Sequence, residues 1–374
     1  MKNSLRFGRK TDLIMKVLIV CLHAPDRVPG QRFRFEQYLD FLRSQGVDCV
    51  YSNLLEEKDY KSFYGKGHYF QKLGIVIRGW FKRKKELKTV GGYDIVFIQR
   101  EAFMLGTCYF EKQYAKKSRI IFDYDDAIWL DLVSGHNRRF RFLKNPDKTS
   151  TIIGLSSLIF AGNQYLADYA ARFNKQVVIV PTTIDTQTYQ PAYQPEKEKI
   201  CIGWSGSFST IAHFETCLDA LKIIKAKYGD KVYFKVIGDG NYRQEELGIR
   251  GLDWKKQSEV KDLQEIDIGI MPLPDDEWSK GKCGLKGLQY MALAIPTIMS
   301  PVGVNSEIIR DGDNGFLASA TDEWVAKLSR LIDSAALRVQ VGEKGRKTVV
   351  DHFSVEANKH LYLKYFEQVA GQKR

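Results

Sequence analysis

The chain is 374 residues long, 44% hydrophobic and 12% aromatic, which is enough apolar material for two hydrophobic cores. A single-domain protein is therefore not expected. The net charge of +12 lies entirely in residues 1–190, which hold 31 Lys and Arg against 19 Asp and Glu, whereas the remaining residues hold 26 of each. No nucleic-acid-binding motif accompanies this basic half, so a nucleic-acid partner is not expected.

The cysteine pattern and the length of the apolar runs narrow the class further. No Cys-x-x-Cys pair occurs, which favours buried free thiols in a reducing cytoplasm over a disulfide or zinc framework, and we expect no structural metal. No run reaches the about 20 apolar residues of a membrane-spanning helix, so we expect a protein that is soluble or lies on a membrane surface. The cysteines are Cys21, Cys49, Cys108, Cys201, Cys217 and Cys283.

The first predicted element is a strand at Met15–Cys21, apolar enough to be buried on both faces of a parallel sheet. A secretory signal peptide is the alternative, because residues 13–22 are mostly apolar and follow a basic start. Lys16 interrupts that run and no small-residue cleavage site follows it, which favours the strand.

Strands and helices then alternate through the first half of the chain. A helix is expected over Phe33–Gln45, because Phe35, Tyr38 and Leu42 fall on one face and Gly46 would end it. Such alternation predicts a parallel sheet covered on both faces. The further strands are predicted at Ile95–Gln99, Arg119–Phe122, Leu158–Ala161 and Val177–Val180.

A second series begins at Lys199, after the polar stretch Asp185–Lys199, which is typical of a linker. We therefore predict an α/β fold with two doubly wound, Rossmann-like domains, over residues 1–190 and 191–355, and a C-terminal helix over 356–374 that packs back on the first domain. The domains would face each other across a cleft, because ligands bind beyond the carboxyl ends of parallel strands. The second series comprises strands at Ile200–Trp204, Tyr233–Ile237, Ile268–Met271 and Thr297–Ser300, and helices at Thr210–Tyr228 and Leu285–Ala292.

The segment Asp267–Ala318 combines features that favour a phosphate ligand. A strand is followed by a polar loop rich in Lys and Gly, and then by a helix whose first N–H groups and dipole attract anions. Lys280, Lys282 and Lys286 surround the start of that helix and would supply the charge for a diphosphate. The alternative is that these lysines are solvated in a loop.

This segment resembles the sugar-donor signature of the retaining GT-B glycosyltransferases of family four, of the glycosyl transferases group 1 type. The resemblance covers most of the chain. It implies the GT-B fold and a hexosyltransferase-type enzyme that moves a sugar from a nucleotide-diphosphate donor to a glycan or lipid-linked acceptor. The matching residues are Gln289-Tyr290-Met291-Ala292, Ile295-Pro296, Gly303, Glu307 and Gly315, with further likeness at Val180–Asp185 and Val236–Gly240.

Two departures from the family pattern concern the donor site. The family places two glutamates eight positions apart, the second on the ribose and the first at the donor sugar or acceptor, and these positions hold Gln289 and Gly281 here. Gln289 would still bond ribose hydroxyls unless it faces solvent, whereas Gly281 puts the sugar contact in doubt. The family's Arg and Lys are replaced in Gly203-Trp204-Ser205-Gly206-Ser207, whose N–H groups and hydroxyls would form a small anion nest.

The same resemblance adds weaker donor-site candidates. Glu307 would lie close to the donor, with a surface helix start as the alternative, and Gly238 belongs to a Gly pair that more often closes a tight turn. In the loop after the first strand the family brings a Gly N–H to the diphosphate. Gly30 is therefore a candidate and Arg32 a second donor, against a plain turn with solvated arginines.

Three carboxylates, Asp123, Asp125 and Asp126, follow the strand predicted at Arg119–Phe122 and are expected to face the cleft. The resembling family has a His at about this place, so we expect one of them to orient the acceptor hydroxyl or take its proton. N-capping of the next helix is the alternative. A D-x-D metal site of the GT-A kind is not expected, because the donor signature lies in the second half and offers lysines instead. We expect no cofactor and no metal requirement.

The segment Lys66–Lys88 combines an apolar stripe at helical spacing with many cations. A basic amphipathic helix of this kind predicts contact with an anionic membrane surface, and we expect a cytoplasmic protein that is peripheral at the inner face of the membrane. The alternative is that the stripe faces the sheet. The stripe comprises Tyr69, Leu73, Val76, Ile77 and Trp80, and the cations are Lys72, Arg78, Lys82, Arg83, Lys84 and Lys85.

The resemblance therefore implies a metal-independent, retaining glycosyltransferase of bacterial-type cell-surface polysaccharide or glycoconjugate synthesis. Its donor would be held mainly by residues 203–315 and its acceptor by residues 15–140. Two alternatives stay open. One is a GT-B-fold protein that binds a nucleotide or glycan without turnover, which the loss of both glutamates favours, and the other is a sugar-nucleotide epimerase on the same fold.

Overall fold

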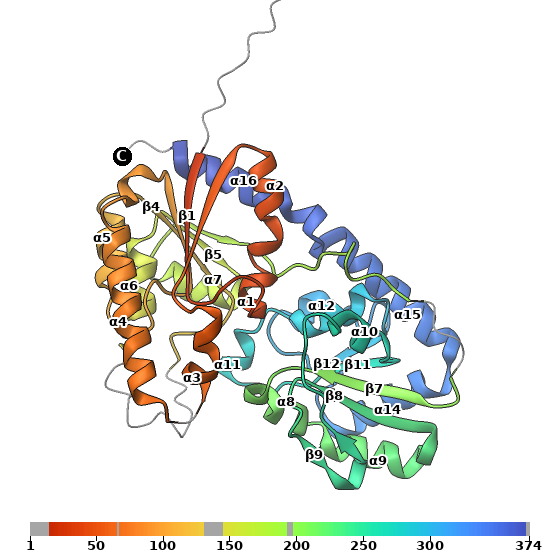
Figure 1. The fold of residues 1–374 in the computed structure, drawn as a ribbon. Coiled ribbons are helices and arrows are strands. Elements are labelled where there is room, and N and C mark those ends of the chain that lie inside the picture. Colours follow the sequence, from red (N-terminus) through yellow and green to blue (C-terminus); the bar gives the residue numbers. More distant parts are fainter. Residues whose placement is uncertain (1–14, 66, 131–144, 193–196, 372–374) are drawn as a thin grey trace, which may run out of the picture.

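The computed structural model describes residues 15–65, 67–130, 145–192 and 197–371. Figure 1 shows two α/β domains side by side, with the last helix running from the second domain back over the first. Lys66, the middle of the predicted linker at 193–196 and the chain end at 372–374 lie outside the described residues.

The first domain contains a six-stranded sheet in the order β2-β1-β3-β4-β5-β6, and all neighbouring strands are parallel. Its strands are β1 (Met15–Cys21), β2 (Val47–Asn53), β3 (Ile95–Gln99), β4 (Arg119–Tyr124), β5 (Leu158–Ala161) and β6 (Val177–Ile179). Its helices are α1 (Pro29–Arg32), α2 (Leu39–Ser44), α3 (Tyr60–Tyr64), α4 (Tyr69–Glu86), α5 (Tyr109–Ala115), α6 (Lys148–Leu155) and α7 (Gln164–Ala171).

Two features of this domain differ from the sequence-based expectation. Strand β2 was not predicted, because it is an edge strand in which buried and exposed residues alternate at first and polar residues interrupt the apolar run. The helix expected over Phe33–Gln45 is shorter, since α2 begins only at Leu39 after two turns that follow α1. Gln31 of α1 and Arg34 of the turn after it are both fully buried.

The second domain contains a five-stranded parallel sheet in the order β13-β12-β11-β7-β8. Its strands are β7 (Ile200–Ser205), β8 (Val232–Ile237), β11 (Ile268–Met271), β12 (Thr297–Met299) and β13 (Phe316–Leu317), beside a hairpin of β9 (Arg243–Gln244) and β10 (Ile249–Arg250). Its helices are α8 (Ile211–Glu215), α9 (Leu218–Tyr228), α10 (Glu259–Gln264), α11 (Glu277–Lys280), α12 (Leu285–Ala292), α13 (Asn305–Ile308), α14 (Thr321–Asp333) and α15 (Ala335–Thr348).

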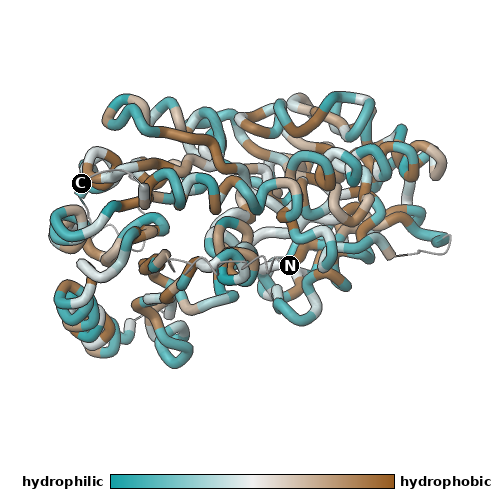
Figure 2. The backbone as a smooth tube through the Cα atoms, turned by 90° about the horizontal axis from the view of Figure 1, so that it is seen from above, coloured by the Kyte–Doolittle hydropathy of each residue, from teal (hydrophilic) through white to brown (hydrophobic). Residues whose placement is uncertain are grey.

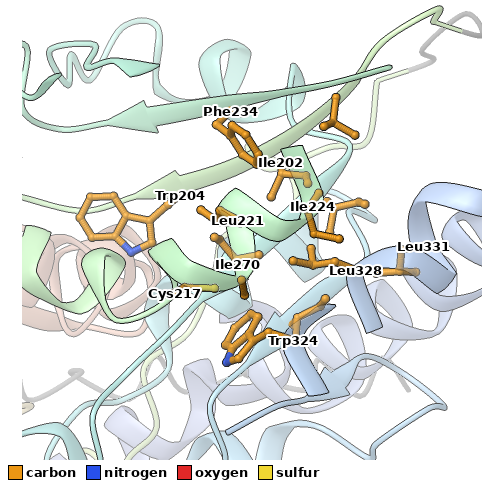
Figure 3. Close-up of a cluster of buried hydrophobic side chains, with 14 of the residues drawn as sticks. Ile202, Trp204, Cys217, Leu221, Ile224, Phe234, Ile270, Trp324, Leu328 and Leu331 are labelled. Carbon is orange, nitrogen blue, oxygen red and sulfur yellow. The ribbon is translucent and has the colours of Figure 1, made fainter. Parts of the chain in front are cut away.

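Aromatic and branched side chains from both layers fill the core of the second domain. Figure 3 shows Trp204 and Phe234 from the sheet near Leu221 of α9, and Trp324 and Leu328 of α14 nearby. The helix predicted at Thr210–Tyr228 is divided at Thr216–Cys217 into α8 and α9, so that both can bury an apolar face. In Figure 2 polar and apolar stretches alternate along the tube, as expected of helices that bury one side.

The last helix, α16 (Val355–Gly371), packs against the sheet of the first domain rather than the second. Tyr362, Phe366 and Val369 are buried against residues of β1, β3 and β5. Tyr362 also donates a hydrogen bond from its hydroxyl to the carbonyl of Arg34, at 2.7 Å. The chain therefore crosses between the domains twice, once near residue 190 and once before α16.

Candidate active site

A cleft of about 1480 Å³ is lined by residues of both domains and lies beyond the carboxyl ends of their strands. Arg100 follows β3 and Asp125 follows β4 on one side, and Ser205 ends β7 on the other. This position agrees with the expectation for facing parallel sheets. The predicted site residues that line the cleft are Gly30, Asp125, Asp126, Ser205, Gly206, Ser207, Gly238, Lys282, Lys286 and Gln289.

An ion pair of Arg100 and Asp125 forms the first-domain side of the cleft. Arg100 has a φ of 62°, a left-handed conformation that is costly for a residue with a side chain and that clusters at functional sites. Its Nε and Nη2 donate to Oδ1 of Asp125 at 2.9 and 2.8 Å. The other oxygen, Oδ2, has no hydrogen-bond partner among the described residues. Asp125 therefore presents one fixed but uncommitted oxygen.

A second ion pair joins the two domains across the cleft. Nζ of Lys282 donates to both carboxylate oxygens of Asp126, at 2.9 and 3.1 Å, and lies 4.1 Å from the centre of the Trp278 ring. The neighbouring Gly281 faces Ala127, and a Cβ added there would come within 2.7 Å of the Ala127 Cβ. The position at which the resembling family has a glutamate thus has no room for a side chain.

Asp123 does not line the cleft, in contrast to the expectation that it faces it. The strand extends to Tyr124, so Asp123 is part of β4 and is fully buried. Its Oδ1 accepts a hydrogen bond from Nη2 of Arg34 at 2.5 Å, within an ion pair that is itself fully buried. A catalytic role was predicted for Asp123, but its buried ion pair with Arg34 indicates a structural role.

The loop after β1 brings one of its two candidates to the cleft. A Cβ added to Gly30 would come within 2.9 Å of Oδ2 of Asp125, so a glycine leaves room for the Arg100–Asp125 pair. Arg32 does not line the cleft. Its Nη2 donates instead to Oε2 of Glu259 in the second domain, at 2.6 Å, and its guanidinium lies 5.4 Å from the centre of the Trp254 ring.

The anion nest expected at Ser205-Gly206-Ser207 is not formed by its backbone. The N–H of Ser205 donates to the Tyr290 hydroxyl at 2.7 Å, that of Gly206 to the Ile237 carbonyl at 2.9 Å, and that of Ser207 to the Thr210 hydroxyl at 3.1 Å. All three donors are therefore already used. Gly238 supports the loop, since a Cβ there would collide with the Gly206 carbonyl.

Lys286 is the cation of the cleft that is left without a carboxylate. It lies in the first turn of α12, is half-buried, and its Nζ is 5.4 Å from the centre of the Trp204 ring. Among the described residues no carboxylate lies within ion-pair distance. Burial and the nearby Lys282 lower the pKa of Lys286 to about 8. An anion that entered the cleft would offset both effects, because it would attract the ammonium form of Lys286.

Gln289 is buried, so the alternative of a solvent-facing residue is excluded. Its Nε2 donates to Oε1 of Glu259 and to the Tyr189 hydroxyl, both at 3.1 Å. Glu259 begins α10, is buried and lines the cleft, with its second oxygen held by Arg32. A carboxylate thus lies next to Gln289, although the sequence position itself holds an amide.

Three further candidates lie away from the cleft. Gly203 is inside β7, and a Cβ there would collide with Ile266, so its role is packing. Lys280 pairs with Asp275 at 3.3 Å and is partly exposed. Glu307 is exposed on α13 and does not line the cleft.

Sequence reasoning missed several residues that line the cleft, namely His23, Tyr64, Arg100, Trp254 and Glu259. A signal existed for Arg100. It directly follows a strand of five buried residues, so it must lie at the carboxyl edge of the sheet. No comparable signal marks Glu259, which lies in a charged, irregular stretch.

The predicted basic helix is formed as α4, but its faces differ from the expectation. Val76 and Trp80 pack against the first-domain core, and Arg83 is fully buried, with its guanidinium bonded to Ser52, Glu86 and backbone carbonyls. A second apolar stripe faces outward. No helix within the described residues is long and apolar enough to cross a membrane. The outward stripe comprises Phe70, Leu73, Ile77 and Phe81, of which Phe70 is 91% exposed.

Part of the second domain matches a known protein family. Residues 199–334 match the family model described as glycosyl transferases group 1. No curated protein sequence matches the chain.

Solved structures resemble almost the whole chain at low sequence identity. Sucrose-phosphate synthase from Thermosynechococcus elongatus is 13% identical with a TM-score of 0.66, covering 95% of this chain and 99% of that one. A glycosyltransferase from Rickettsia africae is 11% identical with a TM-score of 0.67, covering 96% and 99%. Anabaena HepE in complex with UDP-glucose is 12% identical with a TM-score of 0.62, covering 95% and 100%.

These likenesses confirm the predicted fold of two Rossmann-like domains in the GT-B arrangement. Residues 199–334, which match the group 1 glycosyltransferase model, lie within that fold, and the two findings together support a glycosyltransferase enzyme.

Proposed function

We propose that the chain transfers a sugar from a nucleoside-diphosphate sugar to a glycan or lipid-linked acceptor, with retention at the anomeric carbon, in cell-surface polysaccharide or glycoconjugate synthesis. The observation that carries the proposal is Lys286, a half-buried ammonium that faces the cleft at the start of α12. A diphosphate there would pair with Lys286 and with Lys282, and the helix dipole would add to the attraction.

The nucleoside of the donor would then lie towards Gln289 and Glu259. Their buried amide and carboxylate are suited to bond the ribose hydroxyls, and Arg32 keeps the carboxylate in place. Anabaena HepE has been solved with UDP-glucose, which makes UDP-sugars the first donors to test. The two lysines supply the countercharge, so we propose that transfer needs no metal ion and continues in chelator.

On the opposite wall, Asp125 would act on the acceptor. Its Oδ2 can accept a hydrogen bond from the acceptor hydroxyl and take its proton. For retention, the acceptor oxygen would bond the anomeric carbon on the same face from which the diphosphate leaves. Arg100 would hold the carboxylate in position, because its Nε and Nη2 both donate to Oδ1. Of the three aspartates predicted from the sequence, Asp125 is therefore the one we assign to catalysis.

The protein would work at an anionic membrane surface, with α4 as the contact. The outward stripe of Phe70, Leu73, Ile77 and Phe81 can enter the headgroup region, and Lys85 and Lys88 are exposed near its end. We therefore propose that the protein is peripheral at the inner face of the membrane.

A thermal-shift panel of nucleotide sugars, followed by detection of the transferred sugar by NMR, tests the proposal. We expect one class of UDP-sugar to raise the melting temperature and Lys286→Ala to abolish that shift, whereas Lys280→Ala, which lies outside the cleft, should not. Stabilisation by none of the nucleotide sugars, or an equal shift in Lys286→Ala, would contradict the donor site.

A second candidate is a protein that binds nucleotide sugars without turnover. It is favoured by the crowded Gly281, where no side chain can replace the family's carboxylate. Slow hydrolysis of a bound UDP-sugar in the absence of an acceptor would separate the two, because only an enzyme releases free sugar at a rate that depends on Asp125.

A further inference from the structure

Three aromatic side chains with near-parallel rings cluster on the first-domain side of the cleft, and two of them, His23 and Tyr64, line it. His23 follows β1, and Tyr60 and Tyr64 begin and end α3. The ring planes differ by 26° for His23–Tyr60, 10° for His23–Tyr64 and 20° for Tyr60–Tyr64, and the corresponding centroids are 5.9, 6.2 and 6.4 Å apart. A single column of three rings would make one distance about twice the others. The three near-equal distances exclude such a column, and we call this cluster of near-parallel rings the aromatic platform.

Hydrogen bonds hold the chain at His23 and Tyr60, whereas Tyr64 is exposed to the cleft. Gln31, which is fully buried, accepts from the N–H of His23 at 3.0 Å and donates to its carbonyl at 3.1 Å. The Tyr60 hydroxyl accepts from the N–H of Ala24 at 3.0 Å. Tyr64 is nevertheless 58% exposed, and both Tyr64 and His23 line the cleft. The Tyr64 hydroxyl lies 3.4 Å from Nε2 of His23, so the exposed ring contacts the fixed one. An exposed aromatic ring in a cleft is suited to bind a ligand rather than to fill a core.

The platform lies on the acceptor side of the cleft. Arg100, which holds Asp125, is close enough to contribute to the lowered pKa of His23, which burial and this charge bring to about 4. His23 is therefore a neutral ring at physiological pH and does not repel or attract by charge. The donor residues Lys286 and Gln289 belong to the opposite domain.

We propose that His23 and Tyr64, backed by Tyr60, bind the reacting sugar ring of a saccharide acceptor and direct its hydroxyl to Asp125. The faces of aromatic rings carry partial negative charge and the C–H groups on one face of a pyranose carry partial positive charge, so the two surfaces attract as well as exclude water. The platform therefore selects a cyclic saccharide terminus, whether or not a lipid is attached to it. This inference rests on the proposed function and adds the acceptor class.

The platform lies close in the chain to the outward stripe of α4. Helices α3 and α4 lie together at the lower end of the first domain, with α3 on the side that faces the second domain (Figure 1). Tyr64 ends α3 only five residues before α4 begins at Tyr69. The outward stripe of α4 and the platform are thus consecutive in the chain.

Saturation-transfer NMR with methyl glycosides, on protein saturated with UDP, tests the platform. The probes are the methyl β-glycosides of glucose, galactose, mannose and N-acetylglucosamine, with hexanol as an apolar probe without a ring. We expect at least one glycoside to receive saturation on the C–H protons of one ring face. Tyr64→Leu, which keeps an apolar side chain but removes the π-face, should weaken that binding about tenfold, and Tyr64→Phe should restore it. Phe173→Leu, an exposed aromatic outside the cleft, is the matched control.

Equal glycoside binding by Tyr64→Leu and the unmodified protein would overturn the inference, as would binding of hexanol with none of the glycosides. UDP affinity, measured by calorimetry on the same samples, reports on the donor site separately. Glycoside binding that is absent while UDP binds contradicts the platform alone. Absence of binding of UDP and of the other nucleoside diphosphates contradicts the proposed function itself.

Discussion

At the scale of single residues, two aspartates only two positions apart have opposite surroundings. Asp123 is the penultimate residue of β4 and is enclosed with Arg34, whereas Asp125 has left the strand and reaches the cleft. The same residue type therefore serves the fold at one position and, as we propose, the reaction at the other. The difference arises where the strand ends.

Substitution by Asn should separate the two roles. Asp123→Asn leaves the Arg34 charge buried without its partner, so we expect a loss of about 3–5 kcal/mol in the free energy of unfolding. Asp125→Asn should keep its melting temperature but lower kcat by roughly 10²-fold or more, with little change in donor affinity. Denaturant titration and steady-state kinetics of both variants provide the measurement. Comparable stability losses in the two variants would argue against the division.

The pKa of Lys286 makes a prediction about pH. Because burial and Lys282 lower this pKa to about 8, the protonated fraction falls as the pH rises from 7 to 9, and only the ammonium form attracts a diphosphate. UDP should therefore bind several-fold more weakly at pH 9 than at pH 7. Binding at pH 8 should take up protons, because the bound anion raises the pKa again.

The variant Lys286→Arg is the test of that cause. A guanidinium stays charged throughout this range, so the decline in affinity should disappear even if the absolute affinity changes. Calorimetry in buffers of different ionisation enthalpy measures both the affinity and the proton uptake. A decline that persists unchanged in the Arg variant would assign it to another group.

At the scale of elements, the sequence predicted most of what apolar runs and turn residues encode. The buried strands β3, β5 and β11 begin and end where they were expected. The edge strand β2, the break between α8 and α9, and the short α2 were not predicted, because each depends on packing against residues that are distant in the chain.

The candidate site shows the same limit. Lys282, Lys286, Gln289 and Asp125 could be found from local pattern and resemblance, and the structure brings them to one cleft. The partnership of Gln289 with Glu259 and Arg32 could not, because it joins three elements from two domains. Backbone hydrogen bonds also decided against the predicted anion nest, and no side-chain pattern reports on these.

The outward face of α4 is predicted to bind anionic membranes. Exposed Lys85 and Lys88 supply attraction that fades within a Debye length of about 10 Å at 0.1 M salt, and Phe70 and Phe81 supply apolar contact. Co-sedimentation with anionic vesicles should therefore weaken with salt and be lost when both lysines are changed to Glu and both phenylalanines to Ser. Arg83 is left intact, because its buried guanidinium holds the fold.

The matched control changes exposed lysines of the other domain, Lys199 and Lys231, to Glu. This variant has the same loss of net charge but an unaltered α4, so it should sediment with the vesicles like the unmodified protein. If both variants bind equally, the membrane contact lies elsewhere. UDP affinity should stay the same in each, because neither set of residues lines the cleft.

At the scale of the whole molecule, several contacts tie the two domains together around the cleft. Arg32 pairs with Glu259, Asp126 with Lys282, and Nδ2 of Asn163 donates to the carbonyls of Lys280 and Lys282 at 3.1 and 2.9 Å. Two of these contacts involve side chains that we assign to the donor, those of Glu259 and Lys282. Donor binding should therefore alter the contacts between the domains as well as fill the cleft.

The last prediction concerns how much α16 stabilises the first domain, against which it packs. Tyr362 is fully buried, lies 4.5 Å from Tyr38 between ring centres and donates to the Arg34 carbonyl, next to the buried Arg34–Asp123 pair. Tyr362→Ala should remove about 3–5 kcal/mol from the stability of the first domain, as truncations of large buried rings do. The nearby exposed Lys364→Ala should change stability by no more than about 0.5 kcal/mol.

Scanning calorimetry with and without UDP can distinguish the domains in the Tyr362→Ala variant. The first domain should melt in a separate transition at lower temperature, because its sheet has lost the anchor from α16. The second domain retains its own core and the donor residues of α12, so UDP should still raise its melting temperature. A single transition with both effects small would mean that α16 contributes little, and that the first-domain sheet is stable without the C-terminal helix that covers it.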